Sequence, residues 1–140
     1  MQKMMWKTEI LTLICAGMIS ATSAQVANQQ QANVPVFDVI HIDAMPKYIP
    51  EIIFQLHRYR DETLADEGIK SCQALQEAGR SNHFTLIEEW ANQAAYDAHI
   101  AREHTRQFRD KIQPMLGAPV DERLHTELAP LKDGDTRKRR

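Results

Sequence analysis

The amino-acid sequence predicts a single α+β domain in which four antiparallel strands form one sheet and two helices cover one face of it. A chain of 140 residues is long enough for one hydrophobic core and short for two. Segments whose apolar residues recur every second position alternate with segments whose apolar residues recur every third or fourth position. The composition, 43% hydrophobic and 26% charged, excludes collagen-like, coiled-coil and fully disordered chains.

The first 24 residues have the pattern of a secretory signal peptide. Lys3 and Lys7 precede an apolar run over residues 10–19, and small residues follow up to Ala24. The run is about half of the ~20 residues that a membrane-spanning helix needs. We therefore expect cleavage after Ala24, an exported protein that is periplasmic or secreted, and no transmembrane span after cleavage. An uncleaved amphipathic extension is the alternative.

Two polar segments flank the expected domain, which is placed at residues 34–130. Residues 25–33 are rich in glutamine and lack periodicity, so they predict a flexible leader. Residues 131–140 end in four consecutive basic residues and predict a disordered basic tail that could contact anionic surfaces. The formal net charge of −2 gives no general reason to bind nucleic acid, so no such partner is expected.

Cysteine usage and sequence motifs give no indication of a bound cofactor. Removal of the signal would also remove Cys15 and leave Cys72 as a single thiol, either a small buried apolar residue or one that pairs between chains. The sequence contains no C-x-x-C pair, no G-x-G-x-x-G, no P-loop and no G-x-S-x-G. We therefore expect neither a cofactor nor a metal ion.

The first half of the domain is predicted to form a strand followed by a helix. Residues 34–43 are β-branched and aromatic, and both faces of this strand carry apolar groups. Pro46 can open the helix, and Gly68 stands in the usual position after a helix end. Between them lies an apolar stripe at three- and four-residue spacing, formed by Ile49, Ile52, Ile53, Leu56, Tyr59 and Leu64.

A weaker strand over residues 69–78 and a stronger one over residues 83–90 follow, joined by a turn. One face of the stronger strand is apolar except for Glu88. A carboxylate there must pair, hydrogen-bond or contact water, so it borders a cavity or binds a partner strand. The apolar residues of this face are Phe84, Leu86 and Trp90.

The second helix is expected to run without interruption from the N-cap Asn92 to Ile112. Pro114 stops it, and residues 120–128 alternate as a half-exposed fourth strand. Apolar or aromatic side chains recur at every fourth position of the helix, namely Tyr96, Ile100, His104, Phe108 and Ile112.

The order strand, helix, strand, strand, helix, strand is the ferredoxin-like, split βαβ arrangement. Two helices can bury one side of its four-stranded sheet. Phe37, Val39 and Ile87 leave too much apolar surface on the other side for a monomer of this size. We therefore expect a two-fold homodimer, with a cavity enclosed between the sheet and the helices of each subunit.

Residues 84–108 resemble the third strand and second helix of the antibiotic biosynthesis monooxygenase (ABM) domain family. Element order extends the resemblance over roughly residues 35–128. It implies a dimeric α+β barrel and, as in several members, oxidation of phenolic or quinol compounds by O₂ without metal, flavin or haem. The positions that carry the resemblance are Glu88, Trp90, Asn92, Ala98, His99, His104 and Phe108.

The sequence departs from the family pattern in two respects. Members that oxidise polyketides have an asparagine four residues before this tryptophan, where the present sequence has Leu86. Haem-degrading members use an asparagine in the first strand and a tryptophan in the second helix. The first strand has no asparagine near His41, and His99 stands nearest the helical tryptophan position. The resemblance therefore disfavours haem degradation.

Oxidation without a cofactor requires a base that deprotonates an electron-rich substrate, donors for the oxyanion and a dry aromatic pocket. Histidine is the natural base because its ordinary pKa is about 6.5. His99 lies three residues after Tyr96, so both can face the same region. We assign His99 the role of base, with Trp90 and Tyr96 as aromatic walls and donors. Packing in the core is the alternative role for each.

Other residues are candidates for substrate binding. His41 and His83 lie on strands and can face the cavity or the solvent. His104 lies on the apolar stripe, where a core or interface histidine is the simpler interpretation. Because five residues turn a helix by about 140°, we expect His99 and His104 not to converge on one metal ion. The full set of candidates is Leu86, Glu88, His41, His83 and His104.

The leading functional hypothesis is a cofactor-independent monooxygenase whose partners are a small aromatic or quinol substrate and O₂. One alternative is a non-catalytic module that holds a small hydrophobic ligand on the same barrel. Another is a cofactor-free isomerase or lyase, which would form its product under strict anaerobiosis.

Overall fold

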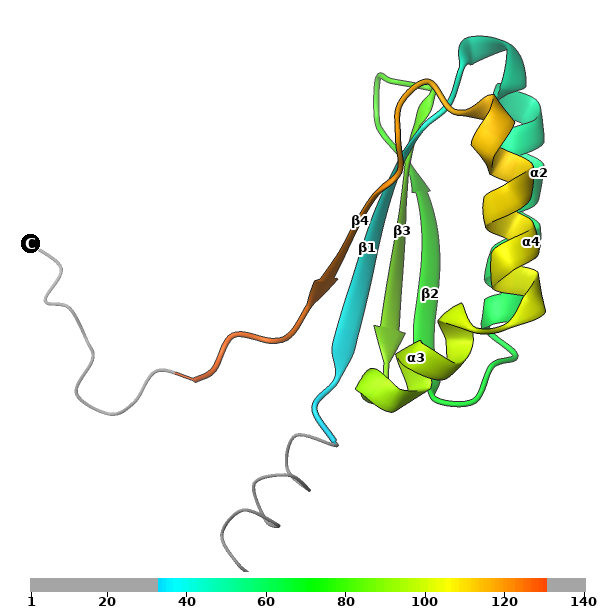
Figure 1. The fold of residues 1–140 in the computed structure, drawn as a ribbon. Coiled ribbons are helices and arrows are strands. Elements are labelled where there is room, and N and C mark those ends of the chain that lie inside the picture. The colour runs from blue at the N-terminus through cyan, green and yellow to red at the C-terminus, as the bar shows by residue number, and fades with distance from the viewer. Residues whose placement is uncertain (1–32, 131–140) are drawn as a thin grey trace, which may run out of the picture.

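Four antiparallel strands form one sheet in the order β2-β3-β1-β4 (Figure 1). The computed structural model describes residues 33–130. The central strands β1 and β3 pair along all eight residues of each. The bounds of the strands are β1 (Val36–Asp43), β2 (Ile69–Gln76), β3 (His83–Trp90) and β4 (Asp121–His125).

Three α-helices lie on one face of this sheet and leave the other face open (Figure 1). They are α2 (Ile49–Thr63), α3 (Gln93–Ile100) and α4 (Glu103–Ile112), and two short 3₁₀ helices, η1 (Pro46–Tyr48) and η2 (Gln113–Met115), adjoin α2 and α4. The element order confirms the predicted ferredoxin-like α+β fold, and β3 has the predicted bounds.

Three predicted segments lie outside the described residues, apart from Asn33 at the boundary. They are the signal peptide at residues 1–24, the leader at residues 25–33 and the basic tail at residues 131–140. Within residues 33–130, no helix is both long and apolar enough to cross a membrane.

The prediction of one continuous helix up to Ile112 is wrong, because the chain leaves the helical conformation at Arg102. The backbone of Arg102 is extended, with φ −72° and ψ 151°. Its side-chain Nε lies 3.0 Å from Asp66 Oδ1, in the loop between α2 and β2. The predicted N-cap is confirmed, because the Asn92 side chain accepts a hydrogen bond from the backbone N–H of Ala95.

Polar groups replace the helical hydrogen bonds that the break removes. The carbonyl of His99 accepts from the Thr105 hydroxyl at 3.0 Å and from the Arg102 backbone N–H at 2.9 Å. The break also changes which side chains face the sheet. His99 is 2% exposed, whereas Ile100, a member of the predicted apolar stripe, is 39% exposed.

The hydrophobic core lies between the inner face of the sheet and α2 and α4. Cys72 is buried in it and forms no disulfide within the described part of the chain. A smaller cluster under α3 is formed by Val36, Trp90 and Tyr96. The main cluster consists of Ile40, Ile42, Ala44, Ile52, Leu56, Tyr59, Phe84, Leu86, Phe108 and Ile112.

Two turn glycines form a matched pair for a stability test. Gly68 and Gly79 both have φ +86°, but a Cβ on Gly68 would lie 2.5 Å from Ala95 Cβ, whereas a Cβ on Gly79 would meet nothing within 4 Å. We expect Gly79→Ala to cost about 1 kcal/mol through its backbone alone. Gly68→Ala should cost at least ~1 kcal/mol more, because α3 must also move away. Urea unfolding of both variants checks this, and equal losses would contradict it.

Candidate active site

A hydrogen-bonded triad of Asp66, His99 and Tyr59 lies beneath the break between α3 and α4. His99 Nδ1 is 2.7 Å from Asp66 Oδ2, and His99 Nε2 is 2.8 Å from the hydroxyl oxygen of Tyr59. A carboxylate can only accept, so Nδ1 carries the proton and donates to Asp66. Nε2 is then unprotonated and accepts a hydrogen bond from the Tyr59 hydroxyl.

Burial sets the protonation states of this triad. It lowers the pKa of His99, against the raising effect of the Asp66 carboxylate, and so favours the neutral imidazole. Burial also raises the pKa of Tyr59 above its ordinary value, so its phenol keeps its proton. The arrangement of carboxylate, histidine and hydroxyl is the one by which proteins hold a histidine in position to accept a proton.

Tyr59 and Asp66 are candidate site residues that sequence reasoning missed. Tyr59 lies on the buried face of α2, 40 positions from His99 in the sequence. Asp66 is 33 positions from His99. Tyr59 belongs to the predicted apolar stripe, and this pattern predicts a packing residue. Its ring does stack on Phe108 with centroids 4.1 Å apart, while its hydroxyl points to His99.

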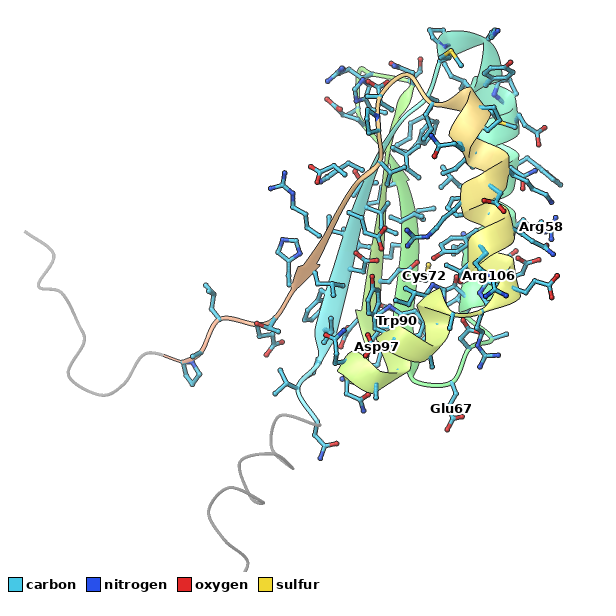
Figure 2. The ribbon with its side chains drawn as sticks, viewed as in Figure 1. Arg58, Glu67, Cys72, Trp90, Asp97 and Arg106 are labelled. Carbon is cyan, nitrogen blue, oxygen red and sulfur yellow. The ribbon has the colours of Figure 1, made fainter. Side chains whose placement is uncertain are left out.

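Trp90 and Glu88 adjoin the triad from the end of β3, where Trp90 lies between the sheet and α3 (Figure 2). The Trp90 ring centroid is 4.5 Å from that of His99, and its Nε1–H donates to Glu88 Oε2 at 3.1 Å. Glu88 Oε2 also lies 3.7 Å from His99 Nε2. Glu88 is fully buried, and this burial raises its pKa to about 7. The structure therefore brings three predicted site residues together.

A second polar cluster surrounds Glu122 on the inner face of β4. Glu122 Oε1 accepts from the Tyr96 hydroxyl at 3.0 Å and from Arg109 Nη2 at 2.7 Å. Burial opposes ionisation of Glu122, but the hydrogen bond and charge of Arg109 hold its pKa below the usual range. Asp38 is buried nearby, on the inner face of β1. Its position between Val36 and Ile40 on an otherwise apolar face was a signal available in the sequence.

A partly open cavity of about 120 Å³ lies between the two polar clusters. Tyr59 links the cavity to the triad, and Arg109 and Glu122 bring the second cluster to its wall. The other residues that line it are Ile40, Phe108, Ile112, Gln113 and Val120.

Three predicted substrate-binding residues are placed away from this cavity. His41 is exposed on the open face of the sheet, where its Nδ1 lies 3.1 Å from Thr85 Oγ1. His83 lies near the opposite end of β3 from Trp90, and its Nε2 is 3.5 Å from Asp43 Oδ1. Leu86 is fully buried in the main core. The assignment of these residues to substrate binding remains a prediction.

His104 lies beside the triad, contrary to the expected separation of His99 and His104. Their ring centroids are 5.4 Å apart, and His104 Nε2 is 3.2 Å from Asp66 Oδ2. The expectation of divergence is wrong because it assumed a continuous helix. The extended backbone at Arg102 reorients α4 and turns both imidazoles toward Asp66.

The buried Asp38 predicts a pH-dependent stability. Burial, followed by the charges of Glu122 and Glu88, raises the pKa of Asp38 to about 8, against about 3.9 in an unfolded chain. Between these values the folded state holds a proton that the unfolded state has lost, so the free energy of unfolding falls as pH rises. Asp38→Asn lacks this proton, so its free energy of unfolding should not fall in the same way. Relative to the parent, we expect it to rise by more than ~1.4 kcal/mol from pH 5 to pH 9, since one pKa unit corresponds to that amount.

Urea unfolding at the two pH values measures this difference. The exposed carboxyl Asp97 on α3, labelled in Figure 2, offers a matched control, Asp97→Asn, which should track the parent at both values. A pH dependence in Asp38→Asn equal to that of the parent would contradict the ionisation assigned to Asp38.

Comparisons with known proteins agree with this fold. The family model for "Antibiotic biosynthesis monooxygenase" matches residues 35–111, more than half of the chain. A Bacillus subtilis protein named "Putative monooxygenase YcnE" is 27% identical over 89 residues, which are 64% of this chain and 93% of the relative.

Solved structures share the architecture. A "Putative antibiotic biosynthesis monooxygenase from Nitrosomonas europaea" has a TM-score of 0.65 at 15% identity, over 71% of this chain and 96% of its own. A conserved protein from Methanosarcina mazei has a TM-score of 0.63 at 21% identity, over 69% of this chain and 96% of its own. These likenesses establish the fold. Because the family model spans most of the domain, from β1 to the last turn of α4, the protein belongs to the antibiotic biosynthesis monooxygenase family.

Proposed function

We propose that this protein is a cofactor-independent monooxygenase that oxidises a small phenolic or quinol compound with O₂. The observation that carries the proposal is the Asp66–His99–Tyr59 triad, whose tyrosine lines a partly open cavity with apolar walls. Membership of the family supports the reaction type. The apolar walls and the Arg109 guanidinium support a substrate that is aromatic and becomes anionic during the reaction.

The first step in this proposal is a proton transfer through Tyr59. The substrate hydroxyl donates to the Tyr59 oxygen, and the Tyr59 proton moves to His99 Nε2. Asp66 stabilises the resulting imidazolium through its hydrogen bond to Nδ1–H. Arg109 offers positive charge to the phenolate that remains.

The phenolate then reduces O₂ by one electron, and the resulting superoxide and phenoxyl radical combine at a ring carbon to form a peroxide anion. This anion takes back the proton that His99 holds and becomes a hydroperoxide. Loss of the hydrogen from that carbon breaks the O–O bond. Its electron pair forms the new carbonyl, and the leaving hydroxide takes a proton to become water. One oxygen atom of O₂ enters the quinone product and the other enters water, so the substrate supplies all the electrons.

Oxygen uptake by the mature protein with a panel of hydroquinones and naphthols tests the proposal. We expect at least one substrate to consume one O₂ per quinone formed, faster than its autoxidation and in the presence of a chelator. Rates equal to autoxidation across the panel would contradict the activity. Product formed at the same rate without O₂ would instead identify an isomerase or lyase.

A module that binds a small hydrophobic ligand without turnover is the second candidate. The burial of both His99 and Glu88 behind the cavity wall favours it, because a ligand reaches neither residue directly. Saturable binding of a naphthol, followed by tryptophan fluorescence and accompanied by no O₂ uptake, would support this function over the enzyme.

The open face of the sheet supports a homodimer as part of the same proposal. Val39 of β1 pairs with Ile87 of β3 at its centre, and Phe37 extends this apolar surface along β1. A second copy of the sheet would cover it in both subunits. The pattern of residues 1–24 likewise supports export to the periplasm or the medium, which the N-terminal mass of the mature protein would test.

A further inference from the structure

We propose that Asp66, His99 and His104 bind a divalent transition-metal ion of the zinc type. One carboxylate oxygen and two imidazole nitrogens, one from each residue, lie within 4.8 Å of one another. They come from three segments: the α2–β2 loop, the end of α3 and the start of α4. Two histidines and one carboxylate form a common ligand set for zinc, with the fourth position left to water.

Two of the three distances between ligand atoms are close to the required spacing, and the third is at most 4.8 Å. Ligands at ~2.0–2.1 Å from a tetrahedral zinc ion lie about 3.3 Å from each other. Asp66 Oδ2 is 3.2 Å from His104 Nε2 and 2.7 Å from His99 Nδ1. The second distance must lengthen by roughly 0.6 Å when the metal replaces the Nδ1 proton, which is a small movement at the end of a helix.

The surroundings of the three ligands support metal binding, because hydrogen bonds alone do not satisfy every ligand atom. His104 Nε2 is buried and has no hydrogen bond within the described residues, because its approach to Asp66 lacks hydrogen-bond geometry. Arg102 binds the other carboxylate oxygen, Oδ1, at 3.0 Å and leaves Oδ2 to face both histidines. Tyr59 contacts the second nitrogen of His99, the place where metal-binding histidines usually have an orienting partner.

His104 lies at the contact between α2 and α4. A narrow crevice between these helices is lined by Tyr59, Glu62 and His104, among others. The His104 side chain is 18% exposed, against 1% for that of His99. His104 is therefore the most exposed of the three ligands, and Asp66 and His99 lie deeper.

Metal binding would have a consequence for the reaction, which rests on the proposed function. A metal on Nδ1 forces the remaining proton of a neutral imidazole onto Nε2. His99 would then donate to Tyr59 instead of accepting from it, and the triad could not take the substrate proton. The bound ion would inhibit the oxygenase, and removal of His104 would abolish this inhibition while leaving the triad in place.

Titration of the metal-free protein with Co²⁺ tests the site without any activity measurement. We expect visible d–d bands of a tetrahedral cobalt complex with a 1:1 end point, displaced by Zn²⁺, and a rise in the unfolding temperature. His104→Ala should weaken binding by more than the ~10–100-fold typical of losing an outer partner. His57→Ala, which removes an exposed histidine of α2, should bind like the parent.

Absence of cobalt bands at millimolar Co²⁺, or equal binding by the parent and His104→Ala, would overturn the site. Asp66→Asn provides a second ligand variant in case His104→Ala fails to fold, and it should lose binding in the same way. The activity arm is separate: zinc should inhibit O₂ uptake by the parent and leave His104→Ala unaffected. Cobalt binding by a parent with no oxygenase activity would uphold the site and reject the proposed function.

Discussion

Replacing His99 with glutamine is expected to lower kcat for quinol oxidation by about 10²–10⁴-fold, the usual contribution of a positioned base. Glutamine fills most of the imidazole volume and can still hydrogen-bond, but it cannot accept the substrate proton. The loss should fall on kcat more than on KM, because Tyr59, not His99, lines the cavity. Oxygen uptake at saturating substrate measures it.

Two further variants separate the chemistry of His99 from its packing. Tyr59→Phe keeps the ring that stacks on Phe108 and removes the hydroxyl that hydrogen-bonds to His99. It should therefore lose most of the activity lost by His99→Gln, and the double variant should lose little more than either single variant. His57→Gln, at an exposed position on the same helix as Tyr59, should retain full activity.

Folding of each variant is checked by its unfolding temperature and near-ultraviolet circular dichroism. A folded His99→Gln protein with the kcat of the parent would reject His99 as the base. A loss in Tyr59→Phe with no loss in His99→Gln would place the base elsewhere, with Glu88 as the nearest alternative because its pKa is raised to about 7 by burial.

Local patterns predicted the elements well wherever one periodicity governed them. In β3 every second residue is buried, and the strand has the expected bounds. Glu88 is the one charged residue on this buried, otherwise apolar face, which makes it a site candidate from the sequence alone. The Asn92 cap also follows from a short-range rule, since a side-chain acceptor satisfies a free N–H of the first helical turn.

The helix break was not predictable from periodicity, because non-local contacts stabilise it. Residues 101 and 102 are good helix formers, and the stripe from Tyr96 to Ile112 continues across them. The Arg102–Asp66 ion pair and the Asp66–His99 hydrogen bond both join residues 33 or more positions apart. The same contacts assemble the triad, so one long-range feature explains both the wrong helix and the missed residues Tyr59 and Asp66.

The strand histidines show a second limit of prediction from sequence, which concerns the two faces of a strand. Alternation divides a strand into two faces without saying which one the helices cover. His41 and His83 belong to the open face, whereas the buried face of β1 carries Asp38. An acidic residue on an apolar face was the stronger signal, because its burial must be compensated, and it marks the polar cluster around Glu122.

Replacing Ile87 with glutamate is expected to dissociate the proposed homodimer. Ile87 lies at the centre of the open sheet face, opposite Val39 of β1, and is half-buried in the single chain. Two-fold symmetry would introduce two carboxylates into one interface, each without a partner. We expect the dissociation constant to rise at least ~10³-fold, about 4 kcal/mol, the order of cost for unpaired buried charges.

Sedimentation velocity from nanomolar to high micromolar concentration measures the change. Phe54→Glu is the matched control, because Phe54 is 60% exposed on α2, on the helical side of the molecule. The control should remain dimeric, because Phe54 is exposed on α2 and lies away from the open face of the sheet. If Phe54→Glu dissociates the dimer and Ile87→Glu does not, the interface is formed by the helices and not by the sheet. A monomeric parent at micromolar concentration would mean that a single sheet tolerates its apolar face in water, and the dimer would have to be abandoned.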